Sequence, residues 1–109
     1  MIEFQYFKEC PHYESTLQNL QALISENFIS NSEVKVIEIT NSKLAKEIHF
    51  QGSPTILYNG YDIYTEKKPE GFSYSCRIYN INNVRTGILT KEYIKNQITK
   101  FRKNIIESK

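Results

Sequence analysis

The first forty residues alternate between strand and helix patterns, and this alternation constrains the fold more than any other feature of the sequence. Apolar and polar residues alternate over 2–7, which is typical of a strand. Apolar residues then recur at spacings of three and four over 13–28, which predicts a helix with one buried face formed by Leu17, Leu20, Ile24 and Phe28. The β-branched run 34–39 is typical of a strand buried on both faces of a parallel sheet. Because a helix connects these two strands, we expect them to pair in parallel.

The middle of the chain predicts a helix followed by a β-hairpin. The expected elements are a short helix through 46–49 capped by Asn41 or Ser42, a strand over 55–58 and a returning strand over 61–64. Asn59-Gly60 separates the two strands and is a strong hairpin signal, because a type I′ turn needs positive φ at both central residues. The hairpin therefore adds antiparallel strands to the parallel pair.

The last third of the chain contains an irregular stretch and one long helix. Residues 65–89 show no regular pattern beyond a candidate strand over 76–79. Thr90 then caps a helix whose apolar stripe contains Ile94, Ile98, Phe101 and Ile105. The predicted order is β-α-β-α-β-β-α, a single α/β domain over 1–109 in which helices flank a four-stranded mixed sheet.

Composition and charge exclude several classes of function. A net charge of +2 is too small to indicate nucleic acid or an anionic membrane surface as the main partner. No apolar run approaches the roughly 20 residues of a membrane-spanning helix, and the alternating N-terminal residues do not resemble a signal peptide. We therefore expect a cytoplasmic protein, in which two cysteines are not expected to form a permanent disulfide.

The sequence also lacks the patterns of common cofactor and metal sites. It has no Gly-rich phosphate loop and no pair of carboxylates at catalytic spacing. Its two histidines and two cysteines show neither Cys-x-x-Cys nor His-x₃-His spacing. We expect no cofactor and no structural metal site.

Cys10 lies where the first strand ends and the first helix begins, and it is the best candidate for a reactive group. A thiol at that place faces unpaired N–H groups and the positive end of the helix dipole, which both favour the thiolate. Pro11 suits the first helical position, where its missing N–H has no cost. His12 could stabilise the thiolate or carry its proton, or it could be a solvated residue of the first turn.

Two motifs resemble those of thioredoxin-like proteins. Cys10-Pro11-His12-Tyr13 resembles the Cys-Pro-His-Cys motif of bacterial disulfide oxidoreductases, with tyrosine in place of the second cysteine. Gly52-Ser53-Pro54-Thr55 is similar to the segment that carries the cis-proline facing the active-site sulfur in that superfamily. The resemblance implies a thioredoxin-like fold, a cis bond before Pro54, and substrate contacts from Pro11, Tyr13, Ser53, Pro54 and Thr55.

A third motif resembles that of a narrower group. Ser75-Cys76-Arg77-Ile78-Tyr79 is similar to a late Ser-Cys-Arg-x-Tyr in small bacterial thioredoxin-like proteins, some of which are labelled alkylmercury-lyase-like. That label implies cleavage of carbon–mercury bonds by paired thiols with a carboxylate proton donor, and no such donor is identifiable in this sequence. Arg77 could raise the thiolate character of Cys76, anchor an anionic group such as a glutathione carboxylate, or simply be exposed.

The tyrosine in place of the second cysteine limits the chemistry of Cys10. Tyr13 could cover the sulfur, donate a hydrogen bond to it or pack at the helix start, but it cannot resolve a mixed disulfide, so glutathione or another cysteine must do so. In the predicted sheet Pro54 begins the third strand at the same end as Cys10, and the hairpin returns the chain to that edge. Cys76 lies in the following loop, within reach of Cys10 but not positioned by any local pattern. The two sulfurs could form a disulfide or hold a soft metal ion.

Three functions follow as hypotheses. The first is thiol chemistry by Cys10 as a single nucleophile, with His12 assisting and Cys76 resolving, on a thiol or disulfide substrate or with glutathione. The second is binding of mercury or another soft ion by Cys10 and Cys76. The third is a non-catalytic thioredoxin-fold module that binds another protein, or a second copy in a homodimer, through a tyrosine-rich surface formed by Tyr58, Tyr61, Tyr64, Tyr74 and Tyr79.

Overall fold

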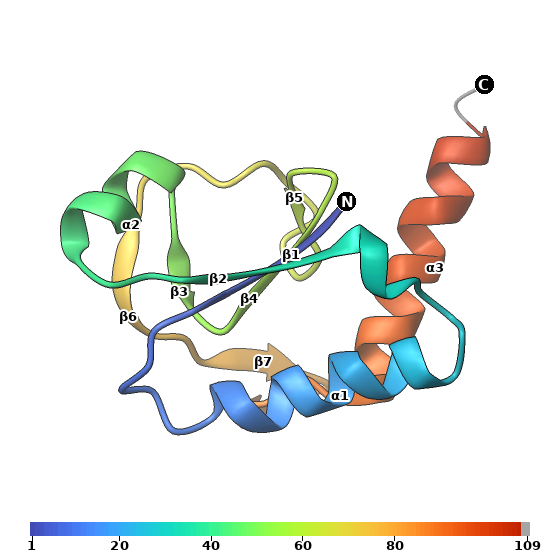
Figure 1. The fold of residues 1–109 in the computed structure, drawn as a ribbon, viewed down its shortest axis with the longest axis horizontal. Coiled ribbons are helices and arrows are strands. Elements are labelled where there is room, and N and C mark those ends of the chain that lie inside the picture. The colour runs from blue at the N-terminus through green and yellow to red at the C-terminus, as the bar shows by residue number, and fades with distance from the viewer. Residues whose placement is uncertain (108–109) are drawn as a thin grey trace.

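A four-stranded mixed sheet in the order β2-β1-β4-β5 forms the centre of the molecule (Figure 1). The computed structural model describes the backbone of residues 1–107 and the side chains of residues 1–103. The strands of this sheet are β1 (Ile2–Tyr6), β2 (Val34–Glu38), β4 (Thr55–Tyr58) and β5 (Tyr61–Asp62). β1 is parallel to β2 and antiparallel to β4, as the sequence predicts. The α/β class and the mixed four-stranded sheet are therefore confirmed.

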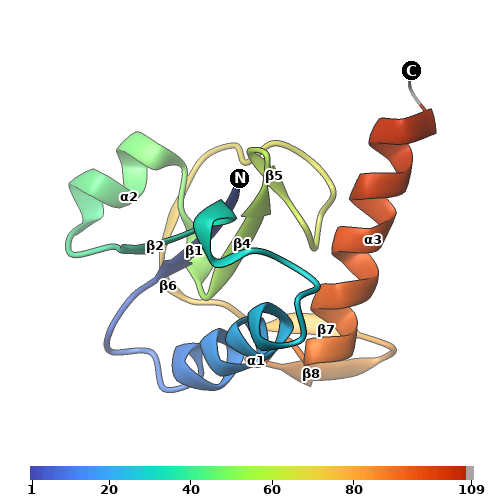
Figure 2. The same ribbon diagram turned by 45° about the vertical axis from the view of Figure 1, so that its right-hand side comes forward.

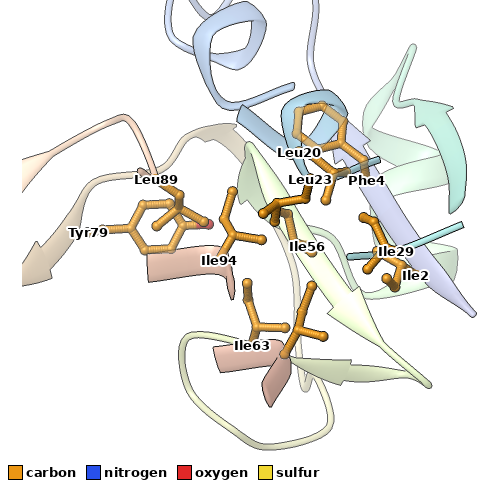
Figure 3. Close-up of a cluster of buried hydrophobic side chains, with 11 residues drawn as sticks. Ile2, Phe4, Leu20, Leu23, Ile29, Ile56, Ile63, Tyr79, Leu89 and Ile94 are labelled. Carbon is orange, nitrogen blue, oxygen red and sulfur yellow. The ribbon is translucent and has the colours of Figure 1, made fainter. Parts of the chain in front are cut away.

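Helices cover both faces of this sheet. They are α1 (Tyr13–Ser25), α2 (Ser42–Ile48) and α3 (Lys91–Glu107), with a short 3₁₀ helix, η1 (Asn31–Glu33), before β2. Ile2 and Phe4 point from β1 into the main core, which α1 and α3 complete (Figure 3). Phe7, the residue after β1, packs instead in a smaller core with Ala45 of α2. Within residues 1–107, no helix is both long enough and apolar enough to cross a membrane.

The helix boundaries follow local capping signals. The Oδ1 of Asn41 accepts a hydrogen bond of 2.8 Å from the Leu44 N–H at the start of α2, and the Thr90 hydroxyl accepts one of 3.1 Å from the Tyr93 N–H in α3. α1 ends at Ser25 rather than near residue 28. The chain leaves this helix through Asn27, whose φ is 62°, so that Phe28 folds back onto the core.

The long final helix carries the expected apolar stripe as far as its side chains are described. Ile94 and Ile98 are fully buried, and Phe101 is half-buried against the main core. Ile105, the fourth predicted member of the stripe, lies outside the described side chains.

The prediction that the strand over 34–39 is buried on both faces is wrong. β2 is an edge strand, and 48% of the Val36 side chain is exposed. The reason is topological, because β4 takes the place on the other side of β1 and leaves β2 with a single neighbour. A β-branched run therefore indicated a strand here without indicating its place in the sheet.

The stretch 65–89 is more regular than its sequence predicts. It contains β6 (Ser73–Cys76), β7 (Tyr79–Ile81) and β8 (Val84–Thr86), where only one strand over 76–79 was expected. β6 pairs in parallel with β3 (Gln51–Ser53), and β7 and β8 form a hairpin that lies beside the first turns of α3 (Figure 2).

Both hairpins turn through two residues with positive φ. Asn59 and Gly60, with φ of 51° and 86°, form the turn that the sequence predicts. Asn82 and Asn83, with φ of 54° and 65°, form the equivalent turn between β7 and β8. Asparagine tolerates this conformation better than most residues, so Asn82-Asn83 was a hairpin signal that the sequence interpretation missed.

Candidate functional site

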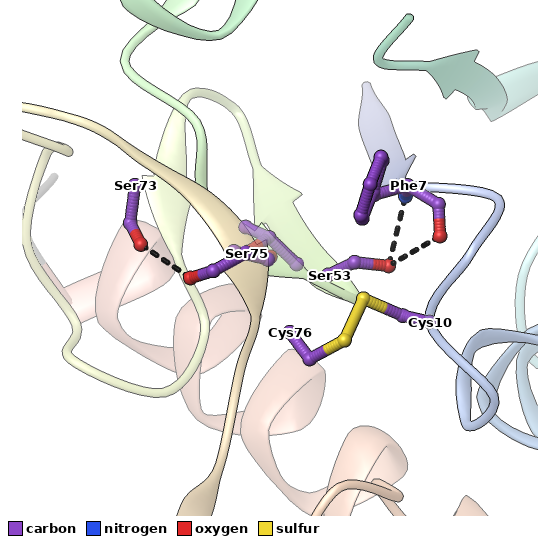
Figure 4. The surroundings of a disulfide bond; sticks show 8 residues. Phe7, Cys10, Ser53, Ser73, Ser75 and Cys76 are labelled. Atoms are coloured by element: carbon purple, nitrogen blue, oxygen red, sulfur yellow. Dashed lines mark hydrogen bonds between the residues drawn. A yellow bond between two sulfur atoms is a disulfide. The ribbon is translucent and has the colours of Figure 1, made fainter. Parts of the chain in front are cut away.

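A disulfide joins Cys10 to Cys76, with 5.5 Å between the two Cα atoms (Figure 4). The sequence left open whether these two residues meet, and the structure brings them together. The Cα separation lies within the range that disulfides require. The bond is permanent only if it resists reduction, so the expectation that the two cysteines form no permanent disulfide stays a prediction.

Cys10 reaches the site through the short connection between β1 and α1. Its N–H donates a hydrogen bond of 3.0 Å to the carbonyl of Phe7, and only 1% of its surface is exposed. α1 begins at Tyr13, so Pro11 lies before the helix and not at its first position. His12 is the N-cap residue, and its side chain forms no capping hydrogen bond to the N–H groups of the first turn. The helix therefore starts three residues after Cys10, and its N-cap residue supplies no side-chain cap.

Cys76 reaches the site through the pairing of β6 with β3. In this register Cys76 is the partner of Ser53, and the Arg77 N–H donates a hydrogen bond of 2.9 Å to the Ser53 carbonyl. The Ser53 hydroxyl in turn accepts a hydrogen bond of 2.8 Å from the Phe7 N–H (Figure 4). One serine thus connects the end of β1 to β6. Unlike Cys10, Cys76 is exposed.

The bond between Ser53 and Pro54 is cis, as the sequence predicts. Ser53, Pro54 and Thr55 are all buried. The Thr55 hydroxyl donates to the carbonyl of Gly52 at 2.5 Å. These residues, predicted to contact a substrate, are therefore covered in the structure, in which the disulfide is formed. Gly52 has a φ of 105°, and a Cβ there would lie 3.0 Å from the Cβ of Arg77, so a glycine lets β6 approach β3.

Arg77 is not exposed, and that interpretation of the sequence is wrong. Its side chain is 10% exposed, with one guanidinium nitrogen 2.8 Å from Oδ2 of Asp62. The same nitrogen donates to the Thr55 hydroxyl at 3.0 Å, and the guanidinium lies 4.6 Å from the ring centre of Tyr79. An anionic ligand would have to compete with Asp62 for this charge. The role of Arg77 in anchoring a carboxylate stays a prediction.

Asp62 is a residue of this site that sequence reasoning missed. It is 1% exposed and belongs to the last residue pair of the β4–β5 hairpin. Its Oδ1 accepts a hydrogen bond of 2.9 Å from the Tyr64 N–H, while its Oδ2 has the charge contact with Arg77 but no aligned hydrogen bond in the described part of the chain. No local pattern pointed to the pair, because Asp62 lies in β5 whereas Arg77 follows β6.

Tyr79 contacts the backbone of the proline. Its side chain is fully buried, and its hydroxyl donates a hydrogen bond to the Pro54 carbonyl. Burial raises the pKa of this hydroxyl above that of a free tyrosine. The predicted tyrosine-rich surface is therefore not continuous. Tyr79 contacts Tyr64, whereas Tyr74 packs on Phe7, and a separate group is formed by Tyr58, Tyr61 and Phe101.

His12 and Tyr13 lie on the helix side of the disulfide. Tyr13 stacks on Tyr6 with ring centres 4.5 Å apart, which matches the interpretation that it packs at the helix start. His12 is exposed and lies against Gly87, where a Cβ would overlap its ring. Among the described residues, the His12 ring forms no hydrogen bond, so its assistance to Cys10 stays a prediction.

Comparisons with protein-family models, with curated proteins and with solved structures found no match for this chain. Within the described residues, no cluster of three or more His, Cys, Asp or Glu side chains is arranged to hold a metal ion. The function is therefore inferred from the geometry around the Cys10–Cys76 bond.

Proposed function

We propose that this chain is a thioredoxin-like protein that exchanges thiols and disulfides through Cys10 and Cys76. One observation carries the proposal. The disulfide joins a buried cysteine before the first helix to an exposed cysteine paired with the residue that precedes a cis-proline. A single-thiol mechanism is no longer needed, because Cys76 can take the role that the second cysteine has in a Cys-x-x-Cys motif.

The order of the elements supports the thioredoxin-like part of this proposal. β1, α1 and β2 form a parallel β-α-β unit, and β4 runs antiparallel to β1 from the cis-proline. Cys10 and Pro54 are consequently at the same end of the central strands. This is the arrangement that the resemblance of the two sequence motifs implies.

The electrostatics around Cys10 support a thiolate in the reduced protein. Cys10 precedes an α-helix of 13 residues whose N-cap residue, His12, forms no side-chain capping hydrogen bond. Such groups and the helix dipole stabilise a nearby negative charge and lower the pKa of a thiol. A protonated His12 would add to this effect at the same helix terminus.

The reaction requires two thiols of a substrate for each turnover. They transfer two electrons and two protons to the protein, which becomes the Cys10 and Cys76 dithiol, and they are released as a disulfide. The reverse reaction oxidises the protein and reduces a substrate disulfide. Glutathione serves as the probe of both directions.

Equilibration with glutathione redox buffers tests the proposal. The thiols are trapped by alkylation at each potential and counted by mass spectrometry. We expect one reversible two-electron transition above about −300 mV, because structural disulfides have potentials below that value. A bond that stays oxidised below about −300 mV would identify a structural disulfide and refute the proposal. Cys10→Ser and Cys76→Ser variants, which cannot form the bond, serve as controls.

The same pair of sulfurs favours one second candidate function. With the bond reduced, two thiolates remain on segments whose Cα atoms are 5.5 Å apart, a suitable site for linear binding of a soft ion. Native mass spectrometry of the reduced protein with Hg²⁺, Cu(I) and Zn²⁺ tests this function. If the Cys10→Ser/Cys76→Ser double variant binds these ions as well as the parent chain, the metal-binding function is excluded.

A further inference from the structure

The two sulfurs of the disulfide differ in their access to solvent. Cys10 is 1% exposed, whereas Cys76 is exposed and is preceded in β6 by the exposed Ser75. We infer that an incoming thiolate attacks the Sγ of Cys76 and expels Cys10, so that the substrate is bound covalently to Cys76. This inference rests on the proposed thiol–disulfide exchange and specifies which cysteine accepts the substrate.

Access is the first argument for this direction of attack. A thiolate must reach the sulfur that it attacks, and the choice between two sulfurs depends on that access. Cys10 is covered by the protein, and Ser53 and Pro54 are buried as well. Attack at Cys10 would require its covering residues to move first, because only 1% of Cys10 is exposed. Attack at Cys76 takes place at an exposed residue.

The stability of the leaving group is the second argument. A thiol with a low pKa leaves faster than one with an ordinary pKa. Cys10 is the cysteine that precedes α1, and the positive end of a helix stabilises a negative charge near it. Arg77 is the cation next to Cys76, but its guanidinium contacts Asp62 at 2.8 Å. The charge that could have stabilised a Cys76 thiolate is therefore already paired with a carboxylate.

The exchange balances in two steps. In the first, a substrate thiolate forms a bond to the Cys76 sulfur, the Cys10–Cys76 bond breaks, and its electron pair stays on Cys10 as a thiolate. In the second, another substrate thiolate attacks the substrate sulfur of this mixed disulfide and expels Cys76. The products are a substrate disulfide, oxidised by two electrons, and the reduced protein.

A trapping experiment with glutathione identifies the sulfur that is attacked. The oxidised full-length protein reacts briefly with reduced glutathione, acid stops the exchange, and a maleimide active at low pH labels the free thiol. Lys8, Lys35 and Arg77 are trypsin sites that place Cys10 and Cys76 on different peptides, so mass spectrometry reads each cysteine separately. We expect glutathione on Cys76 and the maleimide on Cys10.

The outcomes separate this inference from the proposed function. Glutathione found mainly on Cys10 would overturn the inference while leaving the exchange activity intact. Glutathione on neither cysteine, with the disulfide unreduced, would refute the exchange activity and the inference with it. The same reaction in urea is the control, because an unfolded chain exposes both sulfurs and should carry glutathione on both. An equal distribution in the folded protein would also overturn the inference.

Discussion

Reduction of the Cys10–Cys76 bond should lower the free energy of unfolding by about 4 kcal/mol. The two cysteines are 66 residues apart in the sequence, so the bond closes a long loop in the unfolded chain. Loop-closure entropy for about 66 residues corresponds to about 4 kcal/mol at 25 °C. The effect acts on the unfolded state, and it is expected even if reduction leaves the folded structure unchanged.

Urea unfolding of the oxidised and the reduced protein measures this difference. The chain has no tryptophan, so far-ultraviolet circular dichroism is the better signal. For a domain of this size, about 4 kcal/mol corresponds to a midpoint lower by roughly 2 to 3 M urea. The Cys10→Ser/Cys76→Ser double variant should unfold like the reduced parent protein, because it lacks the same constraint.

A small difference between the two redox states would refute this reasoning. If the reduced protein unfolds within about 1 kcal/mol of the oxidised protein, loop closure does not dominate the effect of the bond. A weaker dependence of the unfolding free energy on urea concentration in the reduced protein, with β6 unfolding before the rest, would also contradict the reasoning. In that case the all-or-none transition on which the calculation depends does not hold.

Three further predictions concern the residues around the site. Asp62→Ala leaves the Arg77 charge buried without a partner and should cost about 3 to 5 kcal/mol in urea unfolding, much of which Arg77→Leu in the same chain should restore. Burial raises the pKa of Tyr79 above its value in the unfolded chain, so the free energy of unfolding should fall as the pH rises above about 10. Urea midpoints measured across that range should fall less steeply for Tyr79→Phe. Gly87→Ala should lower the free energy of unfolding by about 1 kcal/mol, because its Cβ overlaps the His12 ring, and this effect should vanish in a His12→Ala background. An equal effect in both backgrounds would contradict the contact.

Local sequence patterns predicted the central sheet and its helices well. The alternation over β1, the helical spacing of α1 and the turn at Asn59-Gly60 each depend on neighbouring residues only. The edge position of β2 could not be predicted in this way, because it depends on where β4 inserts. The short strands β6 to β8 lack an alternating pattern, and no local pattern indicates that β6 pairs with β3.

The candidate site was predictable in part for the same reason. Cys10 and the cis-proline are recognisable from motifs of a few residues each. The bond to Cys76 depends on the path of an exposed segment that the local sequence does not specify. The ion pair of Asp62 with Arg77 likewise joins β5 to the segment after β6, and neither residue alone indicates its partner.

The hydrogen bonds and the ion pair on both sides of Cys76 affect the lifetime of a mixed disulfide. Before it in β6, the Ser73 N–H donates to the Phe50 carbonyl at 2.6 Å, and after it Arg77 binds Ser53 and Asp62. None of these contacts involves sulfur, so they can persist after reduction and keep the two thiols at a high effective concentration. Cys10 then competes with any second substrate thiol by returning to Cys76 within the same molecule. The mixed disulfide on Cys76 is therefore short-lived, and it has to be trapped with acid soon after it forms.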